Sequence, residues 1–330
     1  MIKKKVLVTG GAGFIGSHIV ELLVKKKFDV TILDNLSNGN LKNLFNLRKK
    51  VKFIKGDIRD KKLLRKIFNK KFNIVMHLAA LADIVPSIED PELYFNVNVV
   101  GTKNIIENCK NFPNIKLIYA ASSSCYGIPK KYPTNEKSEI KTEYPYALTK
   151  FLGEQMIMHY AKVYKFKACS LRLFNVYGTR SRTSGAYGAV FGIFLKQKIS
   201  NKPFTIVGDG KQTRDFTYVK DVANAFFKAL QNKSFNKILN VGSGKNYSIN
   251  LVADLLGGEK VYIPKRPGEP DKTFADIKKI KKVLNWKPSY SLEMGIKILI
   301  DNIDYWKDAP LWTPKKIDKA TKAWFKYLSK

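Results

Sequence analysis

The sequence predicts an α/β fold built on a doubly wound parallel sheet. Apolar strand-like segments alternate with amphipathic helical segments through the first half of the chain, which is the pattern of βαβ units. A glycine-rich turn stands between the first strand and the first helix, as in dinucleotide-binding sheets. The length of 330 residues also leaves room for a second domain or an attached cap.

Each element of the sheet follows from a local pattern. Right-handed crossovers place the helices on both faces of the sheet. A polar loop over 37–40 leads into a short amphipathic helix that ends near residue 50. The other predicted strands are 6–8, 30–33, 51–54, 74–78 and 116–120, and the helices are 15–24, 61–70, 91–111 and 145–164.

The glycines of the first turn have the spacing G-x-x-G-x-x-G, and each has a separate purpose. Gly10 turns the chain sharply out of the strand, Gly13 lets the backbone approach a pyrophosphate, and Gly16 packs the helix on the sheet. Phe14 and Ile15 begin that helix, whose free N–H groups face the phosphates. The turn predicts a nucleotide site rather than an ordinary strand-to-helix connection.

Asp34 ends the second strand, 18 residues after Gly16, where a carboxylate that binds the adenosine ribose is expected. Its charge favours NAD over NADP, and the next residue is Asn35 rather than an arginine. Asp57, followed by Ile58, either binds the adenine amine or caps the next helix, and both interpretations stay open.

Small and polar residues follow the later strands, at the edge of the sheet where ligands bind. After the core histidine His77, the residues Leu78, Ala79 and Ala80 leave room for a flat ring. The fifth strand runs into Ser122, Ser123 and Ser124, which either form a turn or donate a hydrogen bond to a reacting oxygen.

Tyr146 and Lys150 are four residues apart and share one face of the predicted helix. A tyrosine ionises near pH ~10 in water. A nearby ammonium and a positively charged nicotinamide favour the phenolate and lower that pKa. Together with a serine at the strand end, the pair predicts a general base that removes a proton from a sugar hydroxyl.

Composition excludes several other classes of protein. The chain has no apolar run long enough for a membrane span and no signal peptide. Three separated cysteines and three histidines without metal spacing predict neither a disulfide framework nor a metal site, which suits the cytoplasm. The net charge of +33 indicates either a phosphate-rich partner or a compositional bias. Because the lysines are scattered over many helices, we expect no nucleic-acid partner.

The motifs together resemble the extended short-chain dehydrogenases/reductases, in their nucleotide-sugar epimerase and dehydratase branch. The resemblance covers nearly the whole chain, and its motifs occur in the family's order. Beyond those above, the matching segments are 98–102, 122–127, 172–178, 208–210, 214–216, 240–242, 266–269, 275–276 and 284–288.

The resemblance implies residue roles. Ser122 matches the catalytic serine or threonine, Tyr146 the base, and Lys150 its partner that also holds the nicotinamide ribose. Asn98 matches an asparagine that bends its helix near the active site. The residues that would hold a nucleotide diphosphate and its base are Asn175, Arg214, Arg266 and Glu269, with Ser123 and Ser124 beside the sugar.

The family also implies an interleaved, smaller α+β domain for the nucleotide sugar. It would comprise 174–216 and 243–330, whereas 1–173 and 217–242 would form the dinucleotide-binding domain. Helices at about 91–111 and 144–164 match those that pair in the family's homodimers. The tail, 312–330, is typical of a capped amphipathic helix.

Members of the family share a first step, in which the base takes the proton of the sugar C4 hydroxyl while hydride passes to NAD. The resembling dehydratases and decarboxylases carry an acid one or two residues after the catalytic residue, where this chain has Ser123 and Ser124. The resemblance therefore favours 4-epimerisation of a UDP-sugar, in polysaccharide biosynthesis. A dehydratase or decarboxylase using another acid, a 4-ketoreductase, and a non-catalytic NAD-sensing or RNA-binding protein remain alternatives.

Thr273 matches the position that lines the sugar pocket near C2 in the resembling epimerases. A small residue there admits N-acetylated sugars, so both the UDP-glucose and the UDP-N-acetylglucosamine pairs are expected substrates. The segment 185–190 resembles the version found in epimerases of N-acetylated sugars. The alternative is that Thr273 is an ordinary loop hydroxyl and the pocket is closed elsewhere.

Overall fold

A seven-stranded parallel sheet forms the centre of the molecule. The computed structural model describes residues 3–181, 190–233 and 235–329, and its sheet has the order β11-β6-β5-β4-β1-β2-β3. This confirms the predicted doubly wound sheet. The strands are β1 (Lys5–Thr9), β2 (Asp29–Asp34), β3 (Lys52–Lys55), β4 (Ile74–His77), β5 (Lys116–Ser122), β6 (Lys167–Leu173) and β11 (Lys237–Val241).

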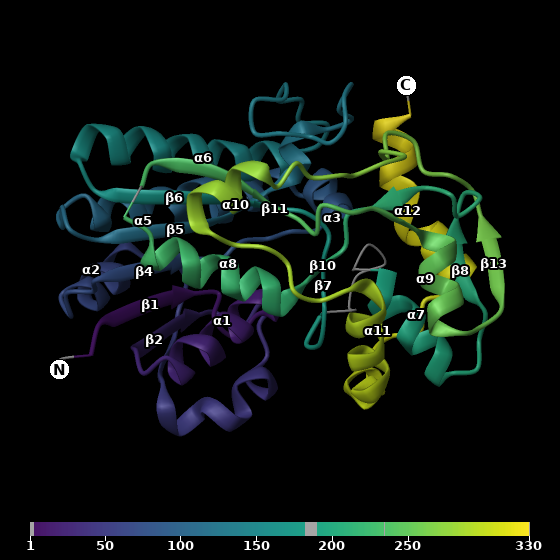
Figure 1. The fold of residues 1–330 in the computed structure, drawn as a ribbon, viewed down its shortest axis with the longest axis horizontal. Coiled ribbons are helices and arrows are strands. Elements are labelled where there is room, and N and C mark those ends of the chain that lie inside the picture. The colour runs from purple at the N-terminus through teal and green to yellow at the C-terminus, as the bar shows by residue number, and fades with distance from the viewer. Residues whose placement is uncertain (1–2, 182–189, 234, 330) are drawn as a thin grey trace.

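Helices cover both faces of this sheet, and each face has its own hydrophobic core (Figure 1). Apolar side chains at helical spacing bury one side of each helix against the strands. One face carries α1 (Phe14–Lys25), η1 (Leu41–Lys50), α8 (Val219–Gln231) and α10 (Lys278–Leu284). The other carries α2 (Lys61–Phe68), α5 (Gly101–Cys109) and α6 (Pro145–Tyr164).

The structure differs from the predicted elements in four places. The segment up to Lys50 is a 3-10 helix. The single helix predicted over 91–111 is α4 (Pro91–Phe95), a π-helical turn η2 (Asn96–Val100) and α5. Neither β6 nor a short helix α3 (Ile84–Glu89) was predicted. The strand β6 has no continuous apolar pattern in the sequence, because two of its residues, Ser170 and Arg172, are polar although buried.

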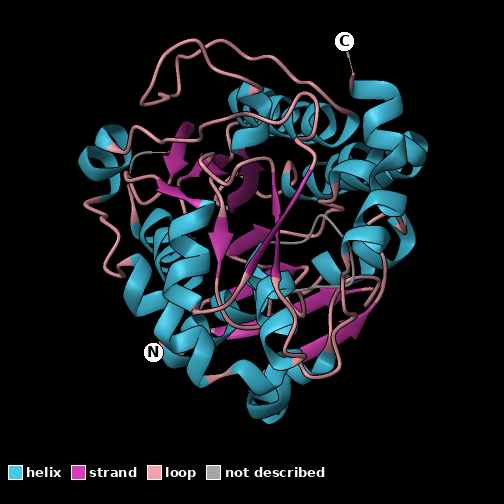
Figure 2. Cartoon of the chain, turned by 90° about the vertical axis from the view of Figure 1, so that its right-hand side faces the viewer, coloured by secondary structure: helices cyan, strands magenta, loops and turns pink. Residues whose placement is uncertain are grey.

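A second group of elements packs around a separate core beside the carboxyl ends of the strands (Figure 2). Its short sheets pair β7 (Val176–Tyr177) with β10 (Thr217–Tyr218), β8 (Phe204–Val207) with β13 (Lys260–Ile263), and β9 (Thr213–Arg214) with β12 (Tyr247–Ser248). Its helices are α7 (Val190–Ile199), α9 (Ile249–Leu256), α11 (Leu292–Asp301), η4 (Ile303–Trp306) and α12 (Pro314–Leu328).

The helix α10 packs against α8 and β11, so part of 243–330 belongs to the core of the large sheet. The predicted division into two interleaved domains stays a prediction. Within the described residues, no helix combines the length and apolar character that crossing a membrane requires.

Candidate active site

A cavity of about 680 Å³ lies at the carboxyl ends of the strands and extends to the second group of elements. Its size is that of a ligand site, and its position is where open α/β sheets bind ligands. Every residue predicted for the site lines this cavity except Asn98. The lining members are Gly10, Gly13, Phe14, Ile15, Gly16, Asp34, Asn35, Asp57, Ile58, Leu78, Ala79, Ala80, Ser122, Ser123, Ser124, Tyr146, Lys150, Asn175, Arg214, Arg266, Glu269 and Thr273.

The glycine-rich turn brings backbone close to the cavity. Gly10 has φ +71°, and a Cβ there would come within 2.7 Å of the Ala79 nitrogen. Gly13 is the residue before α1, and a Cβ on it would meet only the Gly10 carbonyl oxygen, at 3.2 Å. The amino end of α1, with its free N–H groups, faces the space left open. The turn therefore fits the pyrophosphate of a dinucleotide.

Asp34 is buried and holds two backbone segments at the nucleotide end of the cavity. Its carboxylate accepts hydrogen bonds from the Ala12 nitrogen at 2.9 Å and the Leu36 nitrogen at 2.8 Å. Burial raises the pKa of Asp34, and these two bonds oppose the shift. Asp34 thus fixes the glycine-rich turn as well as facing the cavity.

Asp57 is held by its own neighbours. Arg59 donates to it through Nε at 3.0 Å and Nη2 at 2.9 Å, and Asn35 donates at 2.9 Å. The Arg59 hydrogen bond is the main reason that the pKa of Asp57 falls to about 2. The alternative that Asp57 caps α2 is wrong, because Asp60 is the capping residue and accepts from Leu63.

His77 is buried in a chain of hydrogen bonds, as the core interpretation predicted. Its Nδ1 lies 2.7 Å from the Thr9 hydroxyl, which accepts from the backbone nitrogens of Leu78 and Ala79 and so donates to His77. The other ring nitrogen then donates to Thr102 at 2.9 Å, and Thr102 donates to the Asn98 carbonyl oxygen at 2.5 Å. Burial lowers the pKa of His77 to about 3, so the ring is neutral.

Asn98 lies behind the cavity wall. Its side chain bonds the Leu81 nitrogen at 2.8 Å and the Leu81 carbonyl at 3.0 Å, and it donates to the Thr149 hydroxyl at 3.1 Å. It sits in the π-helical turn η2, which agrees with the implied bend. Asn98 therefore connects the loop after β4 to α6 instead of lining the cavity.

The predicted catalytic residues all line the same cavity. Ser122 ends β5, and its hydroxyl accepts from Ser124 Oγ at 2.8 Å. Tyr146 is the second residue of α6, after Pro145 has begun the helix, and it hydrogen-bonds to the hydroxyls of Ser122 and Ser124. Lys150, one turn later, is 5% exposed.

Burial dominates the electrostatics of this group. It raises the pKa of Tyr146, opposed by the Ser122 hydrogen bond, so the expected lowering is not found in the protein itself. Burial also lowers the pKa of Lys150 to about 7, and the charge of Glu154 opposes that shift. The protein alone therefore keeps the phenol neutral and the ammonium easy to deprotonate.

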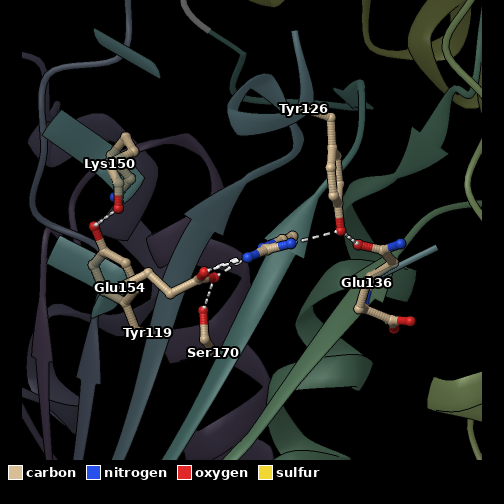
Figure 3. A network of polar contacts seen from close by, with 8 residues as sticks. Tyr119, Tyr126, Glu136, Lys150, Glu154 and Ser170 are labelled. Atoms are coloured by element: carbon tan, nitrogen blue, oxygen red, sulfur yellow. Dashed lines mark hydrogen bonds and ion pairs between the residues drawn. The ribbon is translucent and has the colours of Figure 1, made fainter. Parts of the chain in front are cut away.

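A buried polar network anchors α6 to the sheet behind the catalytic group (Figure 3). Arg172 on β6 donates to Glu154 on α6 through Nη2 at 2.6 Å, and it also donates to the Tyr126 hydroxyl at 2.9 Å. Ser170 donates to the same carboxylate at 2.7 Å. Because the charges are paired and hydrogen-bonded, the network fixes the helix that carries Tyr146.

The substrate end of the cavity holds the predicted polar residues together. Arg214 Nη2 is 2.7 Å from Glu269, and Arg266 Nη1 is 3.9 Å from the other oxygen of that carboxylate. Thr273 donates to Asn175 Oδ1 at 2.7 Å and accepts from the Asp215 nitrogen at 2.9 Å. Two arginines on one acidic residue form a site apt for a diphosphate.

Sequence reasoning missed several residues that line the cavity. Tyr144 stacks near Tyr146, with ring centroids 6.3 Å apart and planes 8° apart, and bonds Ser124. Glu143 and Asp83 bring carboxylates to the wall, Glu143 with Lys141 at 3.4 Å. The aromatic and aliphatic side chains of Trp324 and Ile317 come from the tail helix. No periodicity or spacing marks loop residues, and an amphipathic pattern does not reveal what a helix covers.

Residues 7–299 match the family model described as GDP-mannose 4,6 dehydratase. A relative from Methanocaldococcus jannaschii named putative UDP-glucose 4-epimerase is 42% identical over 90% of this chain and 97% of its own.

Solved structures of 4-epimerases are similar to this chain, and two of them are described here. The UDP-N-acetylglucosamine 4-epimerase of Methanobrevibacter ruminantium, in complex with UDP-N-acetylmuramic acid, has a TM-score of 0.85 and 34% identity over 92% of this chain and 100% of that one. The UDP-glucose 4-epimerase of Thermus thermophilus, in complex with NAD, has a TM-score of 0.83 and 34% identity over 93% and 100%.

Proposed function

Because this chain belongs to the GDP-mannose 4,6-dehydratase family, within the extended short-chain dehydrogenases/reductases, we propose that it is an NAD-dependent 4-epimerase of UDP-sugars. The observation that carries the proposal is the Ser122, Tyr146 and Lys150 group, at which Ser123 and Ser124 stand where dehydratases and decarboxylases of the family have an acid. Relatives and similar structures named as UDP-sugar 4-epimerases support it.

The site fits NAD as the resident cofactor. The glycine-rich turn would hold the pyrophosphate, Asp34 the adenosine ribose, and Lys150 with Tyr146 the nicotinamide ribose. When bound, NAD supplies the hydride acceptor, and later the donor, for the sugar C4 carbon. The similar structure with NAD supports this assignment.

The chain's own residues supply proton transfer and orientation. Once NAD is bound, the Tyr146 phenolate would be favoured by the positively charged nicotinamide, and it would take the proton of the C4 hydroxyl while Ser122 donates a hydrogen bond to the oxygen at C4. Arg214 and Arg266 would hold the diphosphate while the sugar rotates between the two hydride transfers. Tyr146 would then return its proton to the C4 oxygen as hydride returns to the opposite face of the ring, so that C4 is inverted.

We propose that the substrates include both the hexose and the N-acetylhexosamine pairs. Thr273 lines the cavity and is small, which leaves room for an acetamido group. A similar structure named as a UDP-N-acetylglucosamine 4-epimerase supports this. The segment 185–190, which gave a second sequence argument, lies outside the described residues except for Val190.

One observation favours dehydration as the second candidate. Glu143 and Asp83 line the cavity that holds Tyr146, so an acid is present although not beside Ser122. A 4-ketoreductase would instead need exchangeable NAD(P)H. A non-catalytic NAD sensor or RNA-binding protein is disfavoured, because it has no use for the assembled Ser122, Tyr146 and Lys150 group.

The deciding experiment incubates the purified protein with UDP-glucose, UDP-galactose and their N-acetylated forms, without added cofactor. We expect interconversion of the C4 epimers with no change in mass. Loss of one water from the product would establish the dehydratase instead. Conversion only after NAD(P)H is added would establish the reductase, and UDP-glucuronate serves as a charged comparison substrate.

We further propose a cytoplasmic homodimer that acts in polysaccharide biosynthesis. All three cysteines are buried and unpaired, as suits a reducing compartment. Leu93 and Phe95 on α4 and Leu148 on α6 are exposed, and these two helices pack against each other, so they offer one apolar surface to a second copy. Light scattering at micromolar concentration tests the pairing, and a monomer would contradict it.

A further inference from the structure

The helix α12 forms part of the wall at the substrate end of the cavity. It begins at Pro314, beyond the segment that matches the family model, which ends at residue 299. Ile317 and Trp324 lie seven residues apart on one face, are 2% and 3% exposed, and both line the cavity. The same helix packs against α3, whose first residue, Ile84, also lines it (Figure 1).

Two hydrogen bonds fix where α12 sits. Just before it, the Trp312 carbonyl oxygen accepts from the buried Gln197 of α7 at 2.8 Å. Near its end, Trp324 Nε1 donates to the Pro267 carbonyl oxygen at 2.6 Å. Thr313 caps the amino end, and Pro314 occupies the first turn. The two hydrogen bonds therefore attach α12 to α7 near its start and to the loop at Pro267 near its end.

Trp324 also contacts the residue predicted to bind the diphosphate. The Arg266 guanidinium lies 5.6 Å from the centroid of the Trp324 ring, within the range of a cation–π interaction. Trp324 also donates a hydrogen bond to the carbonyl oxygen of Pro267, the residue next to Arg266. One side chain thus constrains both the backbone and the cation of this loop, which faces Glu269 and Arg214.

We propose that α12 is a positioning element of the substrate site, in which Trp324 orients Arg266 for the nucleotide diphosphate. This inference rests on the proposed function, because it takes the diphosphate of a UDP-sugar as the ligand of Arg266. Trp324 is a positioning residue and takes no part in proton transfer at C4. Its removal should weaken substrate binding while leaving the chemical step and the dinucleotide site unchanged.

The test compares Trp324→Ala and Trp324→Phe with Tyr327→Ala, a control on the exposed side of the same helix. UDP affinity is measured by calorimetry, together with KM, kcat and dinucleotide content. Trp324→Ala should weaken UDP binding and raise KM about tenfold, or ~1.4 kcal/mol, with kcat within about threefold of wild type. Trp324→Phe keeps a ring but loses the N–H donor, so it should fall between.

A double-mutant cycle with Arg266→Ala tests the route of the effect. If Trp324 acts through Arg266, Trp324→Ala should weaken UDP binding little further when Arg266 has already been replaced by alanine. Fully additive losses, or UDP binding by Trp324→Ala within about twofold of wild type, would overturn the inference. Should Trp324→Ala fail to fold, Trp324→Phe with the cycle decides. A folded wild-type protein that binds no UDP would contradict the proposed function instead.

Discussion

The Lys150 ammonium lies 4.3 Å from the centroid of the Tyr119 ring, and the Tyr119 hydroxyl donates to the Lys150 carbonyl oxygen at 3.2 Å. Tyr119 comes from β5 and Lys150 from α6, so the strand supports the lysine at both its side chain and its backbone (Figure 3). An aromatic face and the nearby Glu154 offset only part of the cost of burying the charge, because the pKa of Lys150 still falls to about 7.

This burial predicts a pH-dependent stability. Between pH 7 and about 10.4, the unfolded chain keeps the Lys150 proton that the folded protein has lost, so stability rises with pH in that window. Lys150→Met removes this contribution. The variant should be more stable than wild type at pH 7, and more stable by a smaller margin at pH 9.5. The two margins in the free energy of unfolding should differ by about 2–3 kcal/mol. Urea unfolding at both values measures it, with Lys162→Met as the exposed control. Equal gains at the two values would refute the prediction.

Tyr146→Phe removes the proposed base while keeping the ring. Turnover should fall by about 10²–10⁴, the usual contribution of general base catalysis. Dinucleotide content after purification should stay at the wild-type level. The matched variant Tyr144→Phe tests the stacked neighbour, which bonds Ser124. It should lose less turnover than Tyr146→Phe, because Tyr144 is not the proposed base. Activity within about tenfold of wild type would remove Tyr146 from that role.

The buried carboxylate of Asp34 predicts which dinucleotide the protein retains. A 2′-phosphate would face this charge, so NAD should be bound and NADP should not. Denaturing the purified protein and identifying the released dinucleotide by mass measures this. The assignment fails if NADP predominates.

Thr273 predicts the tolerance for N-acetylated sugars, and its contacts set the control. Thr273→Val removes the hydroxyl that bonds Asn175 and Asp215, whereas Thr273→Tyr also adds bulk. The effect of bulk is therefore the difference between the two variants. Thr273→Tyr should lose the N-acetylated pair by a further factor of roughly 10–200 while keeping the hexose pair. Rates for both pairs decide the matter, and equal losses would exclude Thr273 as the gate.

The sheet and the nucleotide end of the cavity could be predicted from the sequence because both depend on local patterns. The spacing of Gly10, Gly13 and Gly16 and the position of Asp34 reflect backbone requirements that few other residues meet. The catalytic group followed in the same way from its strand end and helix spacing. Arg214 and Arg266 were reached only through the family resemblance, since an arginine in so basic a chain carries no signal of its own.

What the sequence missed depends on tertiary packing. The π-helical turn around Asn98 comes from hydrogen bonding, and the hydrophobic pattern of 91–111 does not show it. The tail was predicted as a helix, but its docking against Arg266 follows from contacts between residues far apart in the chain. The pKa of Tyr146 was predicted in the wrong direction for the protein itself. The sequence indicates a neighbouring charge but does not show how deeply the phenol is buried.

The hydrogen-bonded chain from Thr9 through His77 and Thr102 to Asn98 continues through the Asn98 side chain to Thr149 on α6. The chain of hydrogen bonds therefore ties the strand that precedes the glycine turn, where the dinucleotide would bind, to the helix that carries Tyr146. A fixed spacing between the two favours the alignment of hydride transfer with proton transfer.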